Sequence, residues 1–590
     1  MNDRTPDHTT ASADVPAFAD VGEFGLDHGI DPEVYRKRWW TLGVLCLSLL
    51  IIMIGNTSLN VALPSLSEQL HATNSQLQWM VDAYSLVGAG LLFAAGNFGD
   101  RYGRKGILQA GLVLFGFATA YAAMFAETAT QLIGARIFMG AGAAMVMPAT
   151  LSIITNIFPS HERAKAVAAW AGISGGGAAI GPLLSGFVLE HYSWNAVFAV
   201  NVPFVIVALV LGAIFVPRSK GESGTPLDLL GAVLSAVGLS VVVYAIIEGP
   251  THGWLSATTL LTASVGLLAI AAFVVHELRT EHPMLDVRLF RIGAFGVSSL
   301  ILTLVFFALM GTFFSMSQML QLVWGYSPLE AAVRLIPISV AMMIAAPQSA
   351  KLAARFGKRR VVAAGMWMVA GGVLVVSMIG VSPNYLVLVA GLFVMAFGMG
   401  TAMSPTTDLL MSSVPRKQAG MGSAMNDTTR ELGGSLGVAI FGSLLASKYA
   451  AGLSGSLDSV PAGAQDAVSG SLAGALRVSS DAGDSGRALA DAARTAWVSG
   501  FKFSLIVAAV VVAVAGLIAW KFLPDQAFDL PMDDDLSDDE LALVSATADL
   551  GNGAVNTTDL PADELAQLVD QANASLAAVQ PTSTTDVAGV

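Results

Sequence analysis

The feature that most constrains this chain is a series of about fourteen apolar runs between Trp39 and Lys521, separated mostly by short polar connections. A bilayer core takes roughly 20 apolar residues per spanning helix, which is the length of these runs. Hydrophobic residues make up 54% of the 590 residues and charged residues only 12%, whereas a soluble chain is about 25% charged. The sequence therefore predicts an all-α polytopic membrane protein with fourteen transmembrane helices.

Basic residues fall in every second connection between the apolar runs, and this sets the expected orientation. The alternate connections Glu248–Trp254 and Val381–Tyr385 contain no Lys or Arg. Positive-inside bias therefore predicts that the basic connections and both termini are cytoplasmic, in a multi-pass protein of the cytoplasmic membrane. Residues 450–496 contain Arg477, Arg487 and Arg494 but must lie outside if the helix count holds. Long loops translocate largely regardless of charge, so these arginines are compatible with fourteen helices and an extracellular loop.

The two ends of the chain differ from its apolar middle. The first residues are polar and acidic and lack the pattern of a signal peptide. From Leu523 to Val590 there are fourteen Asp or Glu and no Lys or Arg, which accounts for the formal net charge of −13. We expect a solvated cytoplasmic tail, and the alternative is a docking segment for a cytoplasmic partner. The single cysteine, Cys46, lies in the first apolar run and is expected to pack there.

An internal repeat divides the chain. The segment "GNFGDRYGRK" (Gly96–Lys105) has an echo in "AKLAARFGKR" (Ala350–Arg359), each placed after the second helix of a half. This arrangement is typical of a transporter built from two parallel six-helix halves. The predicted divisions are an N-terminal arm at 1–38, a first half at 39–220, two inserted helices at 221–280, a second half at 281–522 with an extracellular loop at about 450–496, and the tail at 523–590.

The residues of the first repeat predict a tight, charged turn between two helices. Glycine adds no side-chain bulk, so Gly96 lets helices approach, and Gly103 is free to adopt a positive φ. Asp100 lies at a helix end, where it can pair with arginines. The alternative is that the basic residues of the loop only anchor the topology; these are Arg101, Arg104 and Lys105.

Ionisable residues inside apolar runs are the candidates for proton coupling or substrate binding, because such residues are costly in a bilayer and usually functional. Arg136 lies within the fourth run and needs a partner, and Asp82 lies within the second. In the thirteenth run, Asp427 and Glu431 are four residues apart and share a helix face. Arg430 is expected close enough to pair with either acid, and Asn426 adjoins them. The alternative for Arg136 is a structural ion pair buried between helices, and for Asp427, Arg430 and Glu431 it is a charge-paired structural cluster at the helix end.

Two further groups of residues concern packing and the cavity. Small residues and a proline in the fifth run predict a tight, bent seam between the halves, with ordinary helix packing as the alternative; they are Gly172, Gly177, Gly181, Pro182 and Gly186. Amides and methionines are expected to line an adaptable, mostly apolar cavity, again with plain packing as the alternative; they are Asn56, Asn60, Gln318, Gln321 and Met342.

Several classes of function are disfavoured. The sequence has no "GxxxxGK[ST]" phosphate loop, so a primary ATP-driven pump is not expected. Its eight histidines show no metal-ligand spacing and no nucleophile motif is present, so we expect no metal, no cofactor, no nucleic-acid partner and no enzyme activity. The expected partners are the lipid bilayer, small lipophilic molecules and protons. A membrane receptor or scaffold acting through the acidic tail is the alternative outside transport.

The motifs together resemble the major facilitator superfamily. Gly96–Lys105 is similar to its signature loop, Arg136–Ala144 to its fourth-helix motif, and Gly172–Gly186 to its antiporter motif. Three further segments resemble the fourteen-helix drug:proton antiporters of the QacA type, namely Asn60–Pro64, Trp79–Leu86 and His282–Phe290. The resemblance implies export driven by the proton gradient, a proton-linked Arg136, and a loop that holds the cytoplasmic side shut in the outward-facing state. Export of an endogenous lipid, peptide or metabolite is the alternative within transport.

The chain departs from that family at two positions. Gly55 and Met342 stand where QacA-type exporters have acids. Those acids are implied to serve cationic drugs, divalent ones above all, so we expect large lipophilic substrates that are monovalent or neutral.

Overall fold

The computed structural model describes residues 31–219, 228–281, 283–414, 419–457 and 460–525, and these form helices and turns without a strand. Most of the predicted N-terminal arm and nearly all of the acidic tail, with its docking alternative, lie outside the described residues. The helices are α2 (Pro32–Gln69), α3 (Asn74–Tyr102), α4 (Arg104–Met124), α5 (Ala129–Ile157), α6 (Ser160–His191), α7 (Ala196–Ala199), α8 (Asn201–Phe215), α9 (Leu229–His252), α10 (Ala257–Arg279), η1 (Val287–Arg291), α11 (Gly293–Gln318), η2 (Met319–Val323), α12 (Pro328–Arg334), α13 (Ile336–Phe356), α14 (Lys358–Val376), α15 (Tyr385–Ser412), α16 (Ala419–Leu457), α17 (Ala462–Gly470), α18 (Leu472–Asp481), η4 (Gly483–Gly486) and α19 (Arg487–Phe522).

Apolar runs and polar caps explain where the long helices begin. Thr73 and Thr128 close capping boxes at the first turns of α3 and α5, and Asp228 and Asn384 accept hydrogen bonds from the first turns of α9 and α15. Each cap satisfies main-chain N–H groups that have no partner inside the helix.

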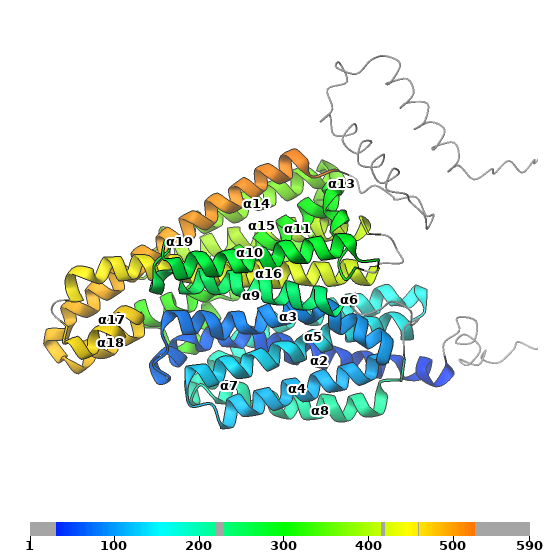
Figure 1. The fold of residues 1–590 in the computed structure, drawn as a ribbon, viewed down its shortest axis with the longest axis horizontal. Helices are drawn as coiled ribbons and strands as arrows, with labels where there is room; N and C mark the ends of the chain where they lie inside the picture. Colours follow the sequence, from blue (N-terminus) through cyan, green and yellow to red (C-terminus); the bar gives the residue numbers. More distant parts are fainter. Residues whose placement is uncertain (1–30, 220–227, 282, 415–418, 458–459, 526–590) are drawn as a thin grey trace, which may run out of the picture.

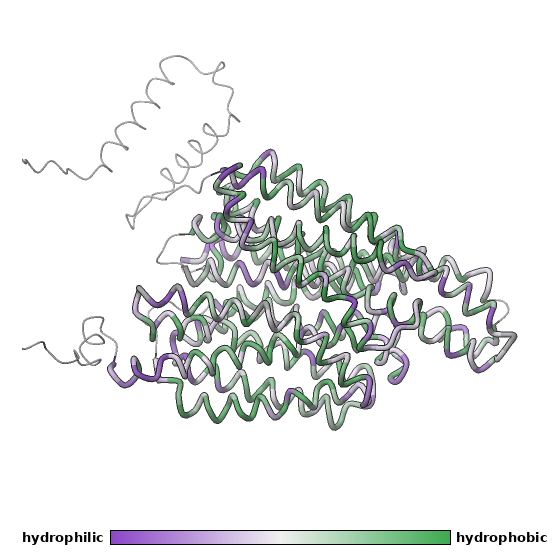
Figure 2. Tube along the Cα trace, turned by 180° about the vertical axis from the view of Figure 1, so that it is seen from behind, coloured by the Kyte–Doolittle hydropathy of each residue, from purple (hydrophilic) through white to green (hydrophobic). Residues whose placement is uncertain are grey.

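Within the described residues, thirteen helical segments are long and apolar enough to cross a membrane. The Gly-rich α6 is not one of the thirteen, so the predicted count of fourteen is not confirmed, while the all-α polytopic fold is. The outer surface of the bundle is apolar (Figure 2), with side chains such as Phe117 and Met378 more than 70% exposed. A surface of this kind fits contact with lipid.

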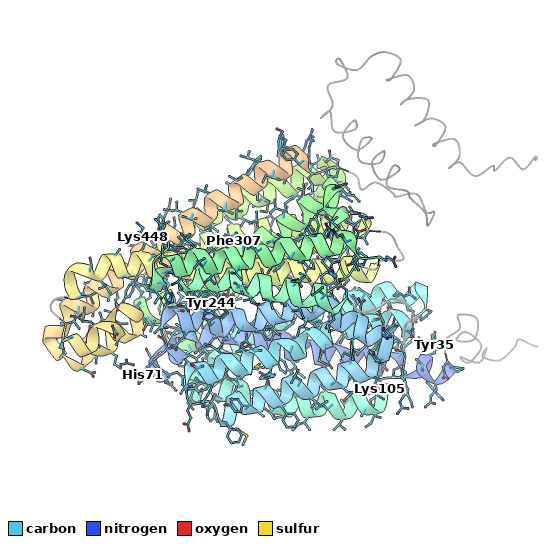
Figure 3. All side chains as sticks on the ribbon, in the orientation of Figure 1. Tyr35, His71, Lys105, Tyr244, Phe307 and Lys448 are labelled. Carbon is cyan, nitrogen blue, oxygen red and sulfur yellow. The ribbon has the colours of Figure 1, made fainter. Side chains whose placement is uncertain are left out.

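The bundle has two ends. One end, here called the basic end, carries Tyr35 and Lys105, and the described chain also leaves the bundle there after α19 (Figures 1 and 3). The other end, here called the far end, carries His71 and Lys448.

The helices fall into two groups that repeat one packing order. In the first half α2 packs on α6 and α8, α5 packs on α3 and α4, and α4 packs on α8. In the second half α11 packs on α16 and α19, α15 packs on α13 and α14, and α14 packs on α19. Each half has its own apolar core. The predicted internal repeat therefore exists as a repeated three-dimensional arrangement, although the domain boundaries remain predictions.

The inserted helices α9 and α10 pack against each other, and α9 lies against α3 and α16, where the halves meet (Figure 1). Near the far end, Glu248 of α9 accepts hydrogen bonds from Ser75 at 2.6 Å and Trp79 at 3.3 Å in α3. Ser443 of α16 donates to the Ile246 carbonyl at 2.7 Å. The pair thus contacts both halves.

Residues of the predicted extracellular loop form the helices α17 and α18, which project beyond the bundle at the left of Figure 1. Tyr449 of α16 donates to the Val468 carbonyl at 2.9 Å. Arg477 of α18 contacts His71 at the end of α2. The hairpin therefore connects the second half to the turn at the far end of α2 in the first half.

Candidate functional site

Two helices from different halves meet through matched polar side chains at the centre of the bundle. Helices α3 and α16 pack on each other and run in opposite directions. Three pairs lie along this contact, here called the seam pairs: Gln78 with Ser443, Asp82 with Ser435, and Ser85 with Glu431. Polar residues recur at helical spacing on both helices, so two polar stripes face each other where the halves join.

Asp82 is the most buried acid of the seam pairs, with a side chain that is 0% exposed. The Ser435 hydroxyl lies beside it. Within the described part of the chain, neither Asp82 carboxyl oxygen accepts a well-formed hydrogen bond, and the Ser435 hydroxyl is likewise unpaired. A buried polar group without a partner is costly, and such groups mark functional positions more often than structural ones.

Arg136 of α5 lies next to this contact and is also 0% exposed. Its Nε donates to the Met80 carbonyl at 2.8 Å and its Nη1 donates to the Gly55 carbonyl at 3.0 Å. The guanidinium carbon lies 4.3 Å from the centre of the Tyr84 ring, in a cation–π contact. Glu431 is near enough to act on the charge of Arg136. The partner that the sequence required for Arg136 is thus mainly main-chain carbonyls and an aromatic ring.

The structure gives a physical reason for the missing acid at Gly55. A Cβ at this position would lie 2.8 Å from the Phe115 ring and 3.7 Å from the Met139 methyl group. A longer side chain would therefore displace Phe115, which is fully buried in the core of the first half. The close packing at residue 55 also keeps its carbonyl within reach of Arg136.

The acids of α16 lie on one helix face, but the predicted ion pair is absent. Among the described residues, Arg430 makes no direct ion pair with Asp427 or Glu431 and its Nε has no hydrogen-bond partner, although its charge is near enough to act on both acids. The guanidinium instead lies over the Phe306 ring, 5.6 Å from its centre. Asn426 donates weakly to Asp427 at 3.4 Å. Side chains at i and i+3 or i+4 are neighbours on a helix, yet their rotamers decide whether they meet, and Arg430 turns toward α11.

The charged loop at the basic end is held within the first half. Asp100 accepts from Arg104 Nε at 2.8 Å and from the Ser152 hydroxyl of α5 at 3.3 Å. Lys105 donates to the Ala213 carbonyl at 2.7 Å, and Arg101 lies beside the Tyr102 ring. Gly103 has φ 122°, the positive φ predicted for it. In this structure Asp100 therefore binds its own half.

The echo loop in the second half repeats this geometry with a different acid. Gly357 also has a positive φ, of 86°. Lys358 pairs with Asp408 of α15 at 2.6 Å. Because α15 corresponds to α5, the negative charge that Asp100 supplies in the first loop is supplied from a neighbouring helix in the second.

The small residues of α6 only partly form the predicted seam. A Cβ at Gly177 would lie 2.7 Å from the Met53 side chain, and Gly181 faces Thr57, so both pack against α2 of the same half. Gly186 packs against the other half, where a Cβ would lie 2.9 Å from Leu329. A Cβ at Gly172 would meet no atom of another described element within 4 Å, and α6 continues as a helix through Pro182. The prediction of a seam between the halves therefore holds at one position, since the small face turns toward α2.

Part of the predicted cavity lining lies where α2 and η2 meet. Gln321 donates to the Val61 carbonyl at 3.0 Å, next to Asn60, whose side-chain oxygen is buried and unpaired. Gln318 donates to Phe314 within its own helix at 3.3 Å. Met342 packs against the core of the second half, which is the packing alternative, and Asn56 is partly buried in α2. The segment η2 is a π-helix, a feature frequent at functional sites.

Hydrogen bonds between the halves gather near the far end. Asn74 donates to the Gly442 carbonyl at 3.0 Å, and the Leu329 amide donates to Glu190 at 3.3 Å. The Gln321 bond to Val61 adds to them. The described halves are thus tied together at the far end, opposite the charged loop.

Three residues of this site, Ser435, Ser85 and Tyr84, were not predicted from the sequence. Ser435 continues the spacing of Asp427 and Glu431 by four residues, and Ser85 follows Asp82 by three. Both extensions were visible as stripes on one helix face. The contact of Tyr84 with Arg136 was not visible, because nothing in the sequence gives the rotation of α3 against α5.

Comparison with known proteins identifies the family. The model of the Major Facilitator Superfamily matches residues 45–438. The multidrug efflux pump LfrA of Mycolicibacterium smegmatis is 37% identical over 488 residues, covering 82% of this chain and 95% of that protein. The methyl viologen resistance protein SmvA of Salmonella typhimurium is 36% identical over 476 residues, covering 78% of this chain and 93% of that protein.

A solved structure supports the fold. The bacterial homologue of the human lysosomal transporter Spinster superposes with a TM-score of 0.59 at 17% identity, covering 82% of this chain and 96% of that one. The family match, the two repeated halves and the relatives lead to one conclusion: this chain belongs to the Major Facilitator Superfamily, whose members are membrane transporters and not enzymes.

Proposed function

We propose that this protein is a proton-coupled antiporter that exports lipophilic drugs or other toxic small molecules across the cytoplasmic membrane by alternating access. The observation that carries the proposal is the set of seam pairs, which place Asp82 of one half against Ser435 of the other, and Ser85 against Glu431. Relatives named as multidrug efflux and methyl viologen resistance proteins support drug export.

The seam pairs suggest how protonation and conformation are linked. A charged side chain deep in a membrane helix costs roughly 2.5 to 3.5 kcal/mol on insertion scales. Asp82 lies where the halves contact each other, so its charge affects how closely they pack. A neutral Asp82 favours the closed contact with Ser435, and an ionised one favours a contact that is open to water. Proton exchange at this residue therefore biases the alternation between states.

The acids of α16 are the proposed binding groups for cationic substrates. Asp427 and Glu431 are four residues apart on one face of α16, and Glu431 meets Ser85 of α3. Between them in the chain, Arg430 lies over the Phe306 ring of α11. A lipophilic cation gains from both apolar burial and a carboxylate. Arg136 acts as the fixed positive charge that limits how much negative charge gathers beside Glu431.

The proposed orientation follows the positive-inside rule, with the basic end and both termini cytoplasmic. In that orientation the structure is tied shut on the outer side, by Asn74 with Gly442 and by Leu329 with Glu190. The loop at Gly96–Lys105, bound to its own half, is then in its released form. It is proposed to bridge the halves when the cytoplasmic side closes.

The test is efflux of ethidium from cells that express the protein, with and without a protonophore. We expect protonophore-sensitive efflux in the wild type and its loss in Asp427→Asn, with both proteins present in the membrane at equal levels. Asp408→Asn is the matched control, because Asp408 pairs with Lys358 at the basic end and not in the seam. Undiminished efflux by Asp427→Asn would remove Asp427 from the mechanism.

A parallel assay with methyl viologen tests the substrate class. This compound carries two positive charges, and the absence of acids at Gly55 and Met342 favours ethidium over it. Equal export of both compounds would show that Asp82, Asp427 and Glu431 suffice for the export of dications. Efflux of neither, from a well-inserted protein, would favour the alternative of an endogenous lipid, peptide or metabolite.

A further inference from the structure

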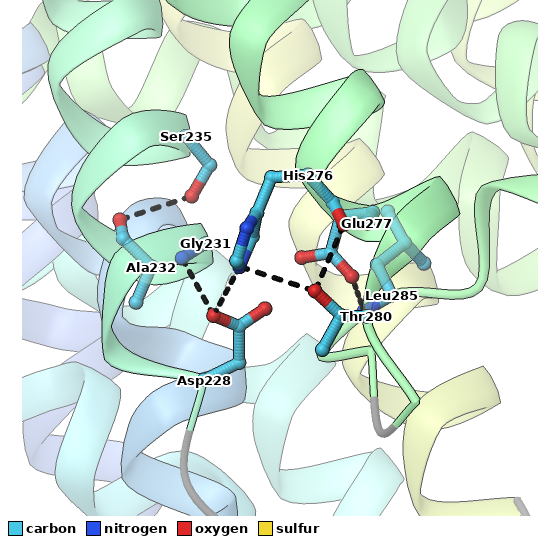
Figure 4. Close-up of polar contacts among 8 residues, drawn as sticks. All are labelled: Asp228, Gly231, Ala232, Ser235, His276, Glu277, Thr280 and Leu285. Atoms are coloured by element: carbon cyan, nitrogen blue, oxygen red, sulfur yellow. Dashed lines mark hydrogen bonds and ion pairs between the residues drawn. The ribbon is translucent and has the colours of Figure 1, made fainter.

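A second group of titratable side chains lies outside the seam, where the inserted helices approach each other at the basic end (Figure 4). Asp228 precedes α9, and His276 and Glu277 lie in the last turn of α10. The segment that follows, 283–292, leads into the second half and includes most of the motif His282–Phe290. None of these residues takes part in the proposed transport site.

The Asp228 carboxylate is fixed by donors on one oxygen only. Its Oδ1 accepts from the Gly231 amide at 2.8 Å and from His276 Nε2 at 2.8 Å. Burial alone would raise the pKa of Asp228, but these donated hydrogen bonds outweigh burial and hold that pKa below its ordinary value. Asp228 is therefore ionised, and its Oδ2 is buried without a hydrogen-bond partner.

Glu277 shows the same asymmetry and faces Asp228. Its Oε2 accepts from the Leu285 amide at 3.2 Å, while its Oε1 has no partner in a side chain that is only 3% exposed. The two unpaired oxygens flank one point: a Cβ at Gly231 would contact Asp228 Oδ2 and lie 2.6 Å from Glu277 Oε1. Glycine at residue 231 leaves room for both carboxyl groups.

We propose that Asp228 and Glu277 form a proton-binding site, in which a proton on Glu277 Oε1 is donated to Asp228 Oδ2. Both unpaired oxygens lie beside the same point at Gly231, so two ionised carboxylates there would repel each other. Like charges so close do not both remain ionised. The charged groups that act on Glu277 from the surrounding elements are Asp228 and His276, and those that act on Asp228 are His276 and Glu277. The bound ligand is the proton itself.

The site is coupled to the chain that joins the inserted pair to the second half. Glu277 holds the Leu285 amide, and Leu285 belongs to a buried apolar cluster with Phe93 of α3 and Met425 of α16. Loss of the shared proton puts two negative charges between α9 and α10, and their repulsion displaces the Glu277 carboxylate and with it the acceptor of the Leu285 amide. This cluster includes residues of both halves. We infer that proton binding at the basic end therefore changes how the two halves pack against each other.

The sign of the effect follows from the proton count. The folded site binds one proton that separated carboxylates would release at neutral pH, so the site is held together at lower pH and loosens as pH rises. This proton is distinct from the one exchanged at the seam, so the inference does not depend on the proposed function.

The test uses the full-length protein in nanodiscs, with hydrogen exchange at residues 283–292 followed as a function of pH and corrected for intrinsic exchange. In the wild type we expect protection of the Leu285 amide to fall by about tenfold as pH rises, which corresponds to about 1.4 kcal/mol. Glu277→Gln keeps the acceptor for Leu285 and adds a donor for Asp228, so protection should become independent of pH. Asp228→Asn keeps the helix cap and removes the opposing charge, with the same expected result.

Glu248→Gln is the matched control, because this acid lies at the far end of the same inserted helix. It should retain the pH dependence of the wild type. The infrared difference spectrum of wild type minus Glu277→Gln should show a protonated carboxyl band that disappears as pH rises, since carboxyl groups elsewhere are common to both proteins. The proposal is overturned if wild-type protection does not change with pH, if Glu277→Gln follows the wild type, or if Glu248→Gln removes the dependence equally.

Discussion

At the residue scale, Arg136 illustrates what a buried charge requires. The sequence indicated that an arginine in an apolar helix needs a partner, and an acid was the obvious candidate. The structure supplies two carbonyls, at Met80 and Gly55, and the ring of Tyr84. Main-chain acceptors leave no signal in a sequence, since every residue has a carbonyl, so this part of the site was not predictable.

Asp82 is the residue whose substitution separates proton exchange from packing. Asp82→Asn keeps the size and polarity of the side chain beside Ser435 but removes its ability to ionise. We expect protonophore-sensitive efflux to fall by about tenfold or more, with little change in thermal stability, because an interaction needed for turnover is lost and not one needed for folding. Efflux rates in proteoliposomes with an imposed pH gradient measure the effect. Gln78→Glu serves as the comparison, because it changes a side chain one turn away on the same polar stripe. Full coupled efflux by Asp82→Asn would contradict the role that we propose for Asp82.

At the scale of elements, the two loops that follow the second helix of each half show how far repeats can be predicted. The echo of Gly103 in Gly357 correctly indicated a special main-chain conformation, since φ is positive at both. Ala354 stands in the second loop where the first loop has Asp100. Instead Asp408 of α15 takes that place, which sequence comparison of the loops alone could not reveal. The sequence also did not predict which neighbour the glycines of α6 face. Gly177 and Gly181 face α2 and not the other half.

Gly103 should tolerate no side chain. Its φ of 122° and ψ of 123° lie in a region that residues with a Cβ rarely adopt. Gly103→Ala should therefore lower the free energy of unfolding by about 1 to 3 kcal/mol. Thermal unfolding of the purified protein in detergent measures this. Gly106→Ala is the matched control, because Gly106 is helical and an added Cβ there would meet no atom of another described element within 4 Å. An equal loss of stability in both variants would show that main-chain strain is not the cause.

At the scale of the whole molecule, the function proposed above makes this structure one of two alternating states. The halves are tied at the far end through α3 with α16 and α6 with α12, while the charged loop at the other end binds only its own half. The sequence predicted the two halves, the inserted pair and the all-α fold from hydropathy and one repeat. The sequence did not predict which end carries the hydrogen bonds between the halves, because in the proposed mechanism the same residues serve both states.

A disulfide across the far end should hold the molecule in this state. A Cβ at Gly470 of α17 would lie 4.0 Å from Thr73 Cβ at the start of α3, within the range of about 3.5 to 4.5 Å that a disulfide requires. In a Cys46→Ala background, Thr73→Cys with Gly470→Cys should form the bond under mild oxidation and lose nearly all efflux, with recovery on reduction. Each single cysteine variant controls for its own substitution. Full efflux from the oxidised double variant would mean that the far end need not open.

The hairpin of α17 and α18 also has a practical consequence for imaging this molecule. Transporters of this size are hard to align in electron micrographs when nearly all their mass lies inside the detergent belt. Here two helices stand clear of the bundle, and the turn at Gly483 that follows them is exposed, has φ 59° and has no neighbour within 4 Å. A small rigid domain fused at that turn would extend α18 and α19 outward, and would give every particle a visible marker of its orientation.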